Sequence, residues 1–239
     1  MDILRTSIQN RLQRDYPDLL RLVRLTRFET QMALVSLKAV CSPRQWGARR
    51  RLIASNDLKV QIGSGSNSVP GWINIDGGGK ADIQIDLRRK LPLRGESVAY
   101  IFTEHFLDHL EYPNGIGHML SECHRVLKPG GILRAVVHDA ELLLRAYVDK
   151  NTEFFHQIGA LDAGGDNALS MIAVVNFLFR FNGFHQFIYD YETLEREFLK
   201  AGFSSVHRSA FRGSVTPELN LDLDLPDRAP QSLYVEAVK

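Results

Sequence analysis

The stretch VQIGSGSN at residues 60–67 decides how the rest of the chain is interpreted. An apolar run ends in two glycines one residue apart, and a polar turn follows. Such a loop can hold a phosphate, a dinucleotide or an adenosyl group. A phosphate loop needs a Lys-Ser/Thr pair after the second glycine, and Asn67 with Ser68 stand there instead. A dinucleotide loop needs a further glycine or alanine, and that position is again Ser68.

Two acids downstream favour the third ligand. Asp76 ends the apolar stretch WINID (72–76), and Asp86 lies in ADIQIDL (81–87). An acid at the end of a second strand can accept hydrogen bonds from both ribose hydroxyls. An acid after a third strand can accept one from an adenine amino group. The spacing therefore predicts a nucleoside site without a pyrophosphate site.

The segments around the loop alternate between strand and helix patterns. Strands are predicted at 58–62, 72–76, 81–87, 97–102 and 132–138, and a closing pair at 204–211 and 232–239. Helices are predicted at 117–127, 141–150 and 191–201, the last capped by Asp190. This alternation predicts a doubly wound α/β sheet.

The 239 residues are divided into a helical, basic extension at 1–54 and a domain at 55–239, with an insertion at about 151–189. Residues 1–51 hold eleven Lys and Arg but only four acids. Helices are expected before Pro17, from Pro17 to about Val40, and around 43–54. A basic amphipathic helix can lie on a membrane. The favoured interpretation is that the apolar side packs on the domain and the arginines face water.

Composition limits the other classes of function. The net charge is +1, and the domain shows no basic stripe, so nucleic acid is not predicted as a partner. Two cysteines form neither a disulfide framework nor a metal-ligand spacing, which favours a cytoplasmic protein.

Five motifs in order carry a resemblance to a known family. They are VQIGSGSN, WINID, DIQIDL, LPLRGESVAYIFTEHFLDHL and LSECHRVLKPGGILRAVVHD. They resemble the motifs of class I S-adenosylmethionine-dependent methyltransferases, especially small bacterial type-11-like members, over residues 58–140. The resemblance implies a Rossmann-like seven-stranded mixed sheet and S-adenosyl-L-methionine as cofactor.

It also implies roles for single residues. Cofactor-binding positions are expected at Gln61, Gly63, Ser64, Gly65, Asp76, Asp86, Leu87, Thr103 and Glu104. Gln61 departs from the family pattern, because many members carry an acid there that helps to hold the cofactor's ammonium group. An amide can still accept a hydrogen bond.

Histidines are the candidates for proton transfer, because their pKa is best matched to neutral pH. His105, His109 and His138 lie at or just beyond predicted strand ends, where open α/β sheets bind ligands. Asp108 between the first two is taken as a solvated or helix-start acid. His185, Phe184 and Tyr189 in the insertion are candidates for binding a substrate.

Glu104, His105, His109 and His138 also have the spacing of a metal-ligand set. Relatives usually work without metal, so no metal is predicted. The predicted function is methyl transfer to a small-molecule acceptor, through O- or N-methylation in natural-product or glycan tailoring. Two alternatives stay open: a cyclisation or rearrangement with the same cofactor, and a protein that binds a membrane or a partner through its basic helices.

Overall fold

The computed structural model describes residues 17–43, 47, 50, 52, 55–159 and 170–239. The helix expected before Pro17 and most of the one expected at 43–54 lie outside these residues. The division into extension, domain and insertion stays a prediction.

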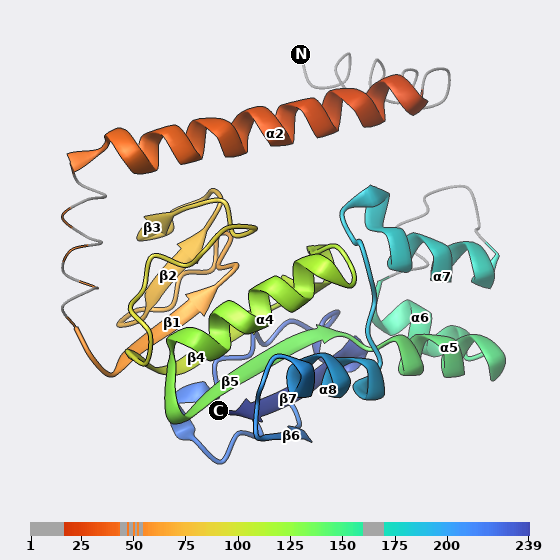
Figure 1. Ribbon diagram of the computed structural model, residues 1–239. Helices are drawn as coiled ribbons and strands as arrows, with labels where there is room; N and C mark the ends of the chain where they lie inside the picture. The colour runs from red at the N-terminus through yellow and green to blue at the C-terminus, as the bar shows by residue number, and fades with distance from the viewer. Residues whose placement is uncertain (1–16, 44–46, 48–49, 51, 53–54, 160–169) are drawn as a thin grey trace.

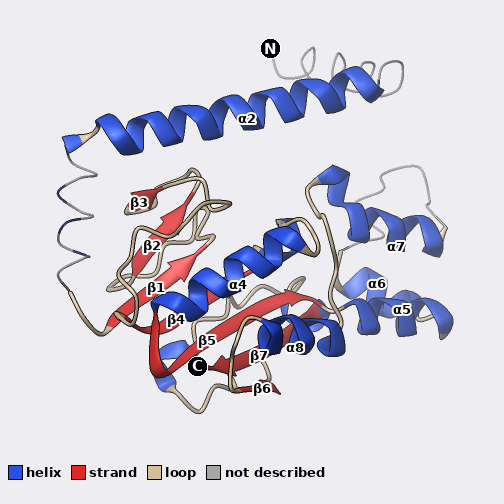
Figure 2. Cartoon of the chain, viewed as in Figure 1, coloured by secondary structure: helices blue, strands red, loops and turns tan. Residues whose placement is uncertain are grey.

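A seven-stranded mixed sheet forms the centre of the molecule (Figures 1 and 2). Its strands are β1 (Leu58–Ile62), β2 (Ile73–Asp76), β3 (Ile83–Gln84), β4 (Val98–Glu104), β5 (Leu127–His138), β6 (Ser205–Arg208) and β7 (Ser232–Val238). The order is β3-β2-β1-β4-β5-β7-β6. The pairs among β1 to β5 are parallel, and β7 is antiparallel to both β5 and β6. The predicted class I methyltransferase fold is confirmed.

Helices cover one face of the sheet. These are α4 (Asn114–Val126) and α8 (Tyr191–Lys200), whose apolar sides join the main core. Asp190 caps α8 as predicted, since its carboxylate accepts a hydrogen bond from the Thr193 amide. Beyond the end of β5, the helices α5 (Ala140–Val148), α6 (Thr152–Gln157) and α7 (Met171–Arg180) form a separate apolar cluster.

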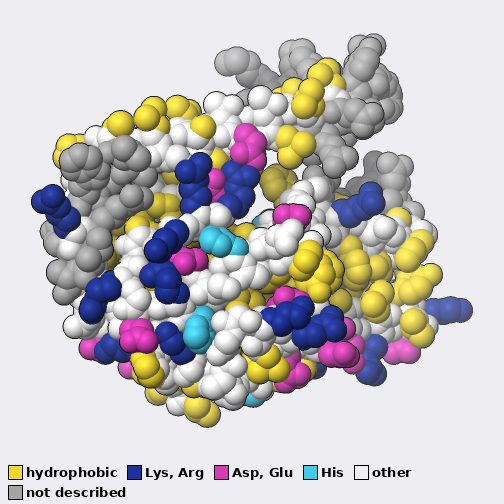
Figure 3. All heavy atoms as spheres, viewed as in Figure 1, with side chains coloured by type: hydrophobic (Ala, Val, Ile, Leu, Met, Phe, Trp, Pro, Cys, Tyr) yellow, Lys and Arg dark blue, Asp and Glu magenta, His cyan; other side chains and the backbone are white. Residues whose placement is uncertain are grey.

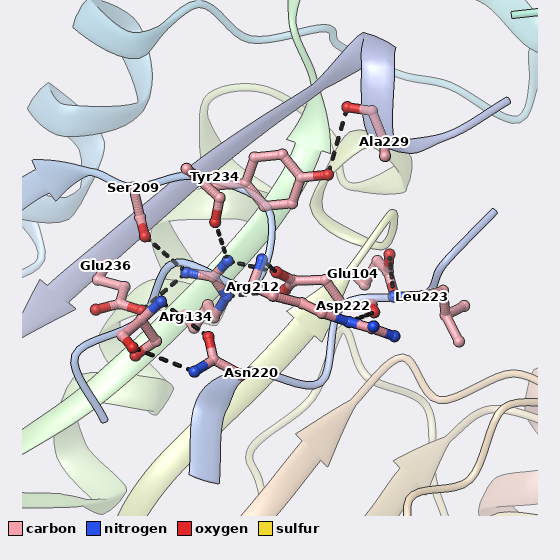
Figure 4. Close-up of polar contacts among 12 residues, drawn as sticks. Glu104, Arg134, Ser209, Arg212, Asn220, Asp222, Leu223, Ala229, Tyr234 and Glu236 are labelled. Atoms are coloured by element: carbon pink, nitrogen blue, oxygen red, sulfur yellow. Dashed lines mark hydrogen bonds and ion pairs between the residues drawn. The ribbon is translucent and has the colours of Figure 1, made fainter. Parts of the chain in front are cut away.

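The other face of the sheet is covered at β4, β5 and β7 by the segment between β6 and β7, which contains the short 3-10 helices η4 (Pro217–Leu219) and η5 (Ala229–Gln231). Arg134 on β5 binds this segment through hydrogen bonds and ion pairs (Figure 4). The five N–H groups of its buried guanidinium reach Asp222, Glu236, Ser209 and the carbonyl of Ala210. The face is therefore fastened by a charged network as well as by apolar contacts.

The helix α2 (Pro17–Cys41) lies above the carboxyl ends of β1, β2 and β3 (Figure 1). The prediction that its apolar side packs on the domain is wrong, because only Met32 and Val35 are buried among its described side chains. Apolar side chains on the opposite side are exposed and form part of a row along the top of Figure 3. They are Leu19, Leu22, Val23, Leu34 and Leu37. Within the described part of the chain, no helix combines the length and apolar character that a membrane span requires.

Candidate functional site

The glycine loop follows β1 at the carboxyl edge of the sheet. Gly63 and Gly65 both have positive φ, at 72° and 52°, a conformation that favours glycine. Asp76 at the end of β2 braces the loop, because its carboxylate accepts hydrogen bonds from the amides of Gly65 (3.0 Å) and Gly78 (2.7 Å). The loop and this acid are thus held together as one unit.

Two buried hydroxyl groups next to the loop have no hydrogen-bond partner among the described residues. They are the Ser64 Oγ in the loop and the Thr103 Oγ1 near the end of β4. Buried polar atoms are normally paired, so these two hydroxyls are open to a partner that a ligand would supply. A Cβ at Gly65 would meet no atom within 4 Å, which leaves its backbone open to approach. These residues fit the polar groups of S-adenosylmethionine.

Three other predicted cofactor residues have partners within the protein. The Gln61 side chain accepts a hydrogen bond from the Val69 amide (3.2 Å) and closes the far end of the loop. Asp86 is paired with Arg88 through both carboxylate oxygens. Leu87 beside it is buried in the core. The roles of these three residues toward a cofactor stay predictions.

Glu104 faces the segment before β7, where its carboxylate accepts hydrogen bonds from the Leu223 amide (3.3 and 3.4 Å; Figure 4). Burial raises the pKa of Glu104, although the Leu223 amide opposes that shift. Its contact with the cofactor stays a prediction, and its hydrogen bonds to Leu223 link the C-terminal segment to β4.

Helix α2 covers the side of the site at β2 and β3. Glu29 forms an ion pair with Arg88, whose guanidinium also holds Asp86. Met32 lies against Gly77, where an added Cβ would be 3.0 Å from its terminal methyl carbon. The helix therefore contacts the same loop that carries the predicted nucleoside-binding acids.

Four histidines gather where β4 and β5 end. The rings of His105 and His138 are 4.3 Å apart, those of His138 and His185 are 4.7 Å apart, and those of His185 and His109 are 5.2 Å apart. Their elements bring them together, since β4 and β5 are parallel neighbours and the segment after α7 returns to the same edge. The Phe106 side chain packs on Gly63 and joins this histidine cluster to the glycine loop.

Asp108 lies at the centre of the cluster, and the expectation of a solvated acid is wrong because it is fully buried. Its Oδ2 lies 3.1 Å from the His138 Nδ1 and 3.8 Å from the His105 Nδ1. Burial alone would raise the pKa of Asp108, but its contacts with His105 and His138 lower it well below its ordinary value. Burial also lowers the pKa of His105.

The tautomers of the other two histidines follow from their contacts. A backbone carbonyl can only accept a hydrogen bond, and His109 Nδ1 lies 3.0 Å from the Phe184 carbonyl. His185 Nδ1 lies 2.7 Å from the Leu178 carbonyl. Both rings therefore carry hydrogen on Nδ1 and leave Nε2 as an acceptor. Burial and the neighbouring His138 lower the pKa of His185 to about 4.

The predicted substrate residues of the insertion occupy different environments. Phe184 is exposed, His185 belongs to the histidine cluster, and Tyr189 is fully buried in the main core. The Tyr189 hydroxyl has no hydrogen-bond partner among the described residues. Burial and the nearby charge of Asp108 raise the pKa of Tyr189.

Sequence reasoning overlooked Ser232, whose Oγ lies 3.1 Å from the His105 Nε2. It begins β7 and faces His138 across the sheet. No local signal points to this serine, because only the antiparallel return of β7 brings it to the histidines.

A model of the family described as a methyltransferase domain matches residues 74–135. The matched part is about a quarter of the chain and runs from β2 into β5, through the central strands of the sheet. No curated protein sequence matches this chain.

Solved structures with a similar fold include the following three. An S-adenosylmethionine-dependent methyltransferase from Thermotoga maritima is 17% identical, with 89% of this chain and 98% of that chain covered and a TM-score of 0.44. One from Archaeoglobus fulgidus is 16% identical, with 87% and 100% covered and a TM-score of 0.47. Phosphoethanolamine N-methyltransferase 2 from Haemonchus contortus is 13% identical, with 81% and 52% covered and a TM-score of 0.43.

Proposed function

We propose that the protein methylates a small molecule that carries a hydroxyl or amine group, and that His109 accepts the proton. The observation that carries this proposal is the fixed tautomer of His109. Its Nδ1 hydrogen is bonded to the Phe184 carbonyl, its Nε2 has no hydrogen-bond partner among the described residues, and the residue is exposed. A base in this state needs no rearrangement before it takes a proton.

The residues around it have complementary tasks. S-adenosylmethionine, when bound, supplies a methyl group activated by its sulfonium. The glycine loop and Asp76 bind and orient the cofactor, while the Phe106 ring excludes water between the loop and the histidines. His185 is neutral at pH 7, so its Nε2 can accept a hydrogen bond from the small molecule. In this proposal His105 and His138 have a structural role: their contacts with Asp108 keep the buried part of the histidine cluster in place.

Product analysis tests the proposal. The full chain is incubated with S-adenosylmethionine and a panel of small phenols, amines and sugars, and the products are separated and weighed. Methylation adds one methyl group to the acceptor and releases one S-adenosylhomocysteine. A product of unchanged composition would support the cyclisation or rearrangement instead.

A variant tests the role of His109. His109→Gln is expected to lower kcat by about 10²- to 10⁴-fold and to leave the affinity for S-adenosylhomocysteine unchanged, as for a lost general base. His118→Gln, an exposed histidine on α4, is the matched control and should keep its turnover. Full turnover in His109→Gln would remove this histidine as the base.

A second candidate function rests on the exposed apolar side of α2, which membranes can bind. We propose that this helix attaches the protein to anionic vesicles. The double variant Leu34→Gln/Leu37→Gln should then sediment less with such vesicles than the wild type. Leu199→Gln on α8 removes an equally exposed leucine and should not differ from the wild type. Equal sedimentation of all three proteins would reject this function.

A further inference from the structure

We propose that His105, Asp108 and His138 bind a divalent first-row transition metal ion, with zinc as the favoured ion. Each residue offers one ligand atom, and these atoms all lie within 4.8 Å of one another. All three side chains are largely or fully withdrawn from solvent.

The spacing of the three ligand atoms fits a metal. The two Nδ1 atoms are 3.2 Å apart, and the Asp108 Oδ2 lies 3.1 Å from one and 3.8 Å from the other. Zinc bonds of about 2.0–2.2 Å in a tetrahedral site place neighbouring ligand atoms about 3.3 Å apart. A point equidistant from all three atoms lies about 2 Å from each, which is the length of such bonds.

The hydrogen bonds outside this triangle orient the imidazole of His105. Ser232 Oγ donates to the Arg228 carbonyl (2.8 Å), so it accepts from the His105 Nε2 hydrogen (3.1 Å). Nδ1 of His105 is then an unprotonated nitrogen that faces Asp108 and His138. Metal-binding histidines typically donate their second ring N–H in this way, which fixes the tautomer.

Asp108 has too few partners for a buried carboxylate. Its Oδ1 has no hydrogen-bond partner among the described residues, and its side chain is fully buried. Buried carboxylates are normally neutralised by an opposite charge or by a metal. The backbone also holds it in place, because the Asp108 carbonyl accepts hydrogen bonds from the amides of Gln186 and Phe187.

Ligand chemistry selects the kind of metal. Two imidazoles and one carboxylate suit zinc, cobalt, iron and manganese better than calcium or magnesium. This ligand set differs from the four residues with metal-ligand spacing in the sequence. Glu104 and His109 have other partners, and Asp108 replaces them. Three protein ligands leave a position open, as in catalytic zinc sites. The use of that position for the acceptor's oxygen rests on the proposed function, whereas metal binding does not.

Metal titration tests the site directly. The full chain is stripped with a chelator, titrated with Co²⁺ while its visible absorption is recorded, and then competed with Zn²⁺. We expect one tightly bound ion per chain with the absorption of nitrogen and oxygen ligands. Asp108→Asn and His138→Gln should each weaken the affinity at least about 100-fold, more than is typical for loss of an outer partner. His118→Gln is the control and should bind as the wild type does.

Each outcome decides the proposal. Cooperative thermal melting shows which variants fold, and His105→Gln replaces any variant that does not. The proposal is overturned if the wild type binds no stoichiometric Co²⁺ or Zn²⁺, or if folded variants bind as tightly as the wild type. An ion bound elsewhere would explain the second result. Methyl transfer is measured separately. A protein that transfers methyl groups but binds no stoichiometric metal rejects only this inference, and one that binds the metal but transfers no methyl group rejects only the proposed function.

Discussion

Gly63 and Gly65 have similar backbone conformations but different surroundings. A Cβ at Gly63 would lie 2.4 Å from Cγ of Phe106, whereas one at Gly65 would meet no atom within 4 Å. Both positions have positive φ, so any other residue is strained there. Gly63 therefore serves the packing of Phe106 between the loop and the histidine cluster, and Gly65 keeps the backbone accessible.

This difference predicts unequal effects on stability. Gly63→Ala should lower the free energy of unfolding by about 2–4 kcal/mol, from backbone strain plus overpacking. Gly65→Ala should cost only the strain, about 1 kcal/mol. Urea denaturation of both variants measures the difference. Equal losses would contradict the contact between Gly63 and Phe106.

At the scale of elements, Arg134 joins β5 to β7 and to the segment that covers the second face of the sheet. The ion pair with Asp222 is buried on both sides. Removing one partner of such a pair leaves the other charge buried without compensation. Arg134→Met should therefore lower the free energy of unfolding by about 3–5 kcal/mol in urea denaturation.

An exposed ion pair provides the control for Arg134. Arg145 and Glu141 pair on α5 with much of both side chains in water. Arg145→Met should change the free energy of unfolding by about 0.5 kcal/mol or less. If Arg134→Met were equally mild, the buried network would not be what holds the C-terminal segment.

Arg88 links two further elements, because it binds Asp86 after β3 and Glu29 on α2. Arg88→Met should release α2 from this edge and speed the dissociation of S-adenosylhomocysteine several-fold. Stopped-flow displacement measures this rate. Arg27→Met removes a charge from α2 itself and should leave the dissociation rate unchanged. If S-adenosylhomocysteine dissociated from both variants at the same rate, α2 would have no role in retaining the cofactor.

The sequence predicts the sheet well and the position of α2 poorly, for a physical reason. Strands such as 58–62 and 132–138 are marked by apolar runs that stay buried whatever covers them. The outward-facing side of an amphipathic helix depends on its docking, so the exposed Leu34 and Leu37 were not foreseen. Asp108 was misjudged for the same reason, because its burial comes from β5 and from residues 186–187.

At the scale of the whole molecule, stability should fall in acid. Burial alone would raise the pKa of Glu122, but hydrogen bonds from Arg125 and the Leu91 amide lower it below its ordinary value. The group therefore contributes stability above its unfolded pKa of about 4.3, and this contribution is lost as pH falls through the folded pKa.

Glu122→Gln tests this contribution. At pH 7 the variant should be about 1–2 kcal/mol less stable than the wild type, because it loses hydrogen bonds to a charged group. The difference should shrink as pH falls below about 4. Urea denaturation at several pH values measures it, with the exposed Glu111→Gln as control. A difference that does not change with pH would contradict the role of the carboxylate.

The central claim is that the loop at residues 60–67 and Asp76 form the cofactor site. Calorimetric titration of the full chain with S-adenosylhomocysteine tests it most directly. The account predicts binding at one site, with affinity at least about tenfold weaker in Asp76→Ala and intermediate in Asp76→Asn, whose amide keeps one acceptor. No binding by the wild type, or the same affinity in all three proteins, would contradict it.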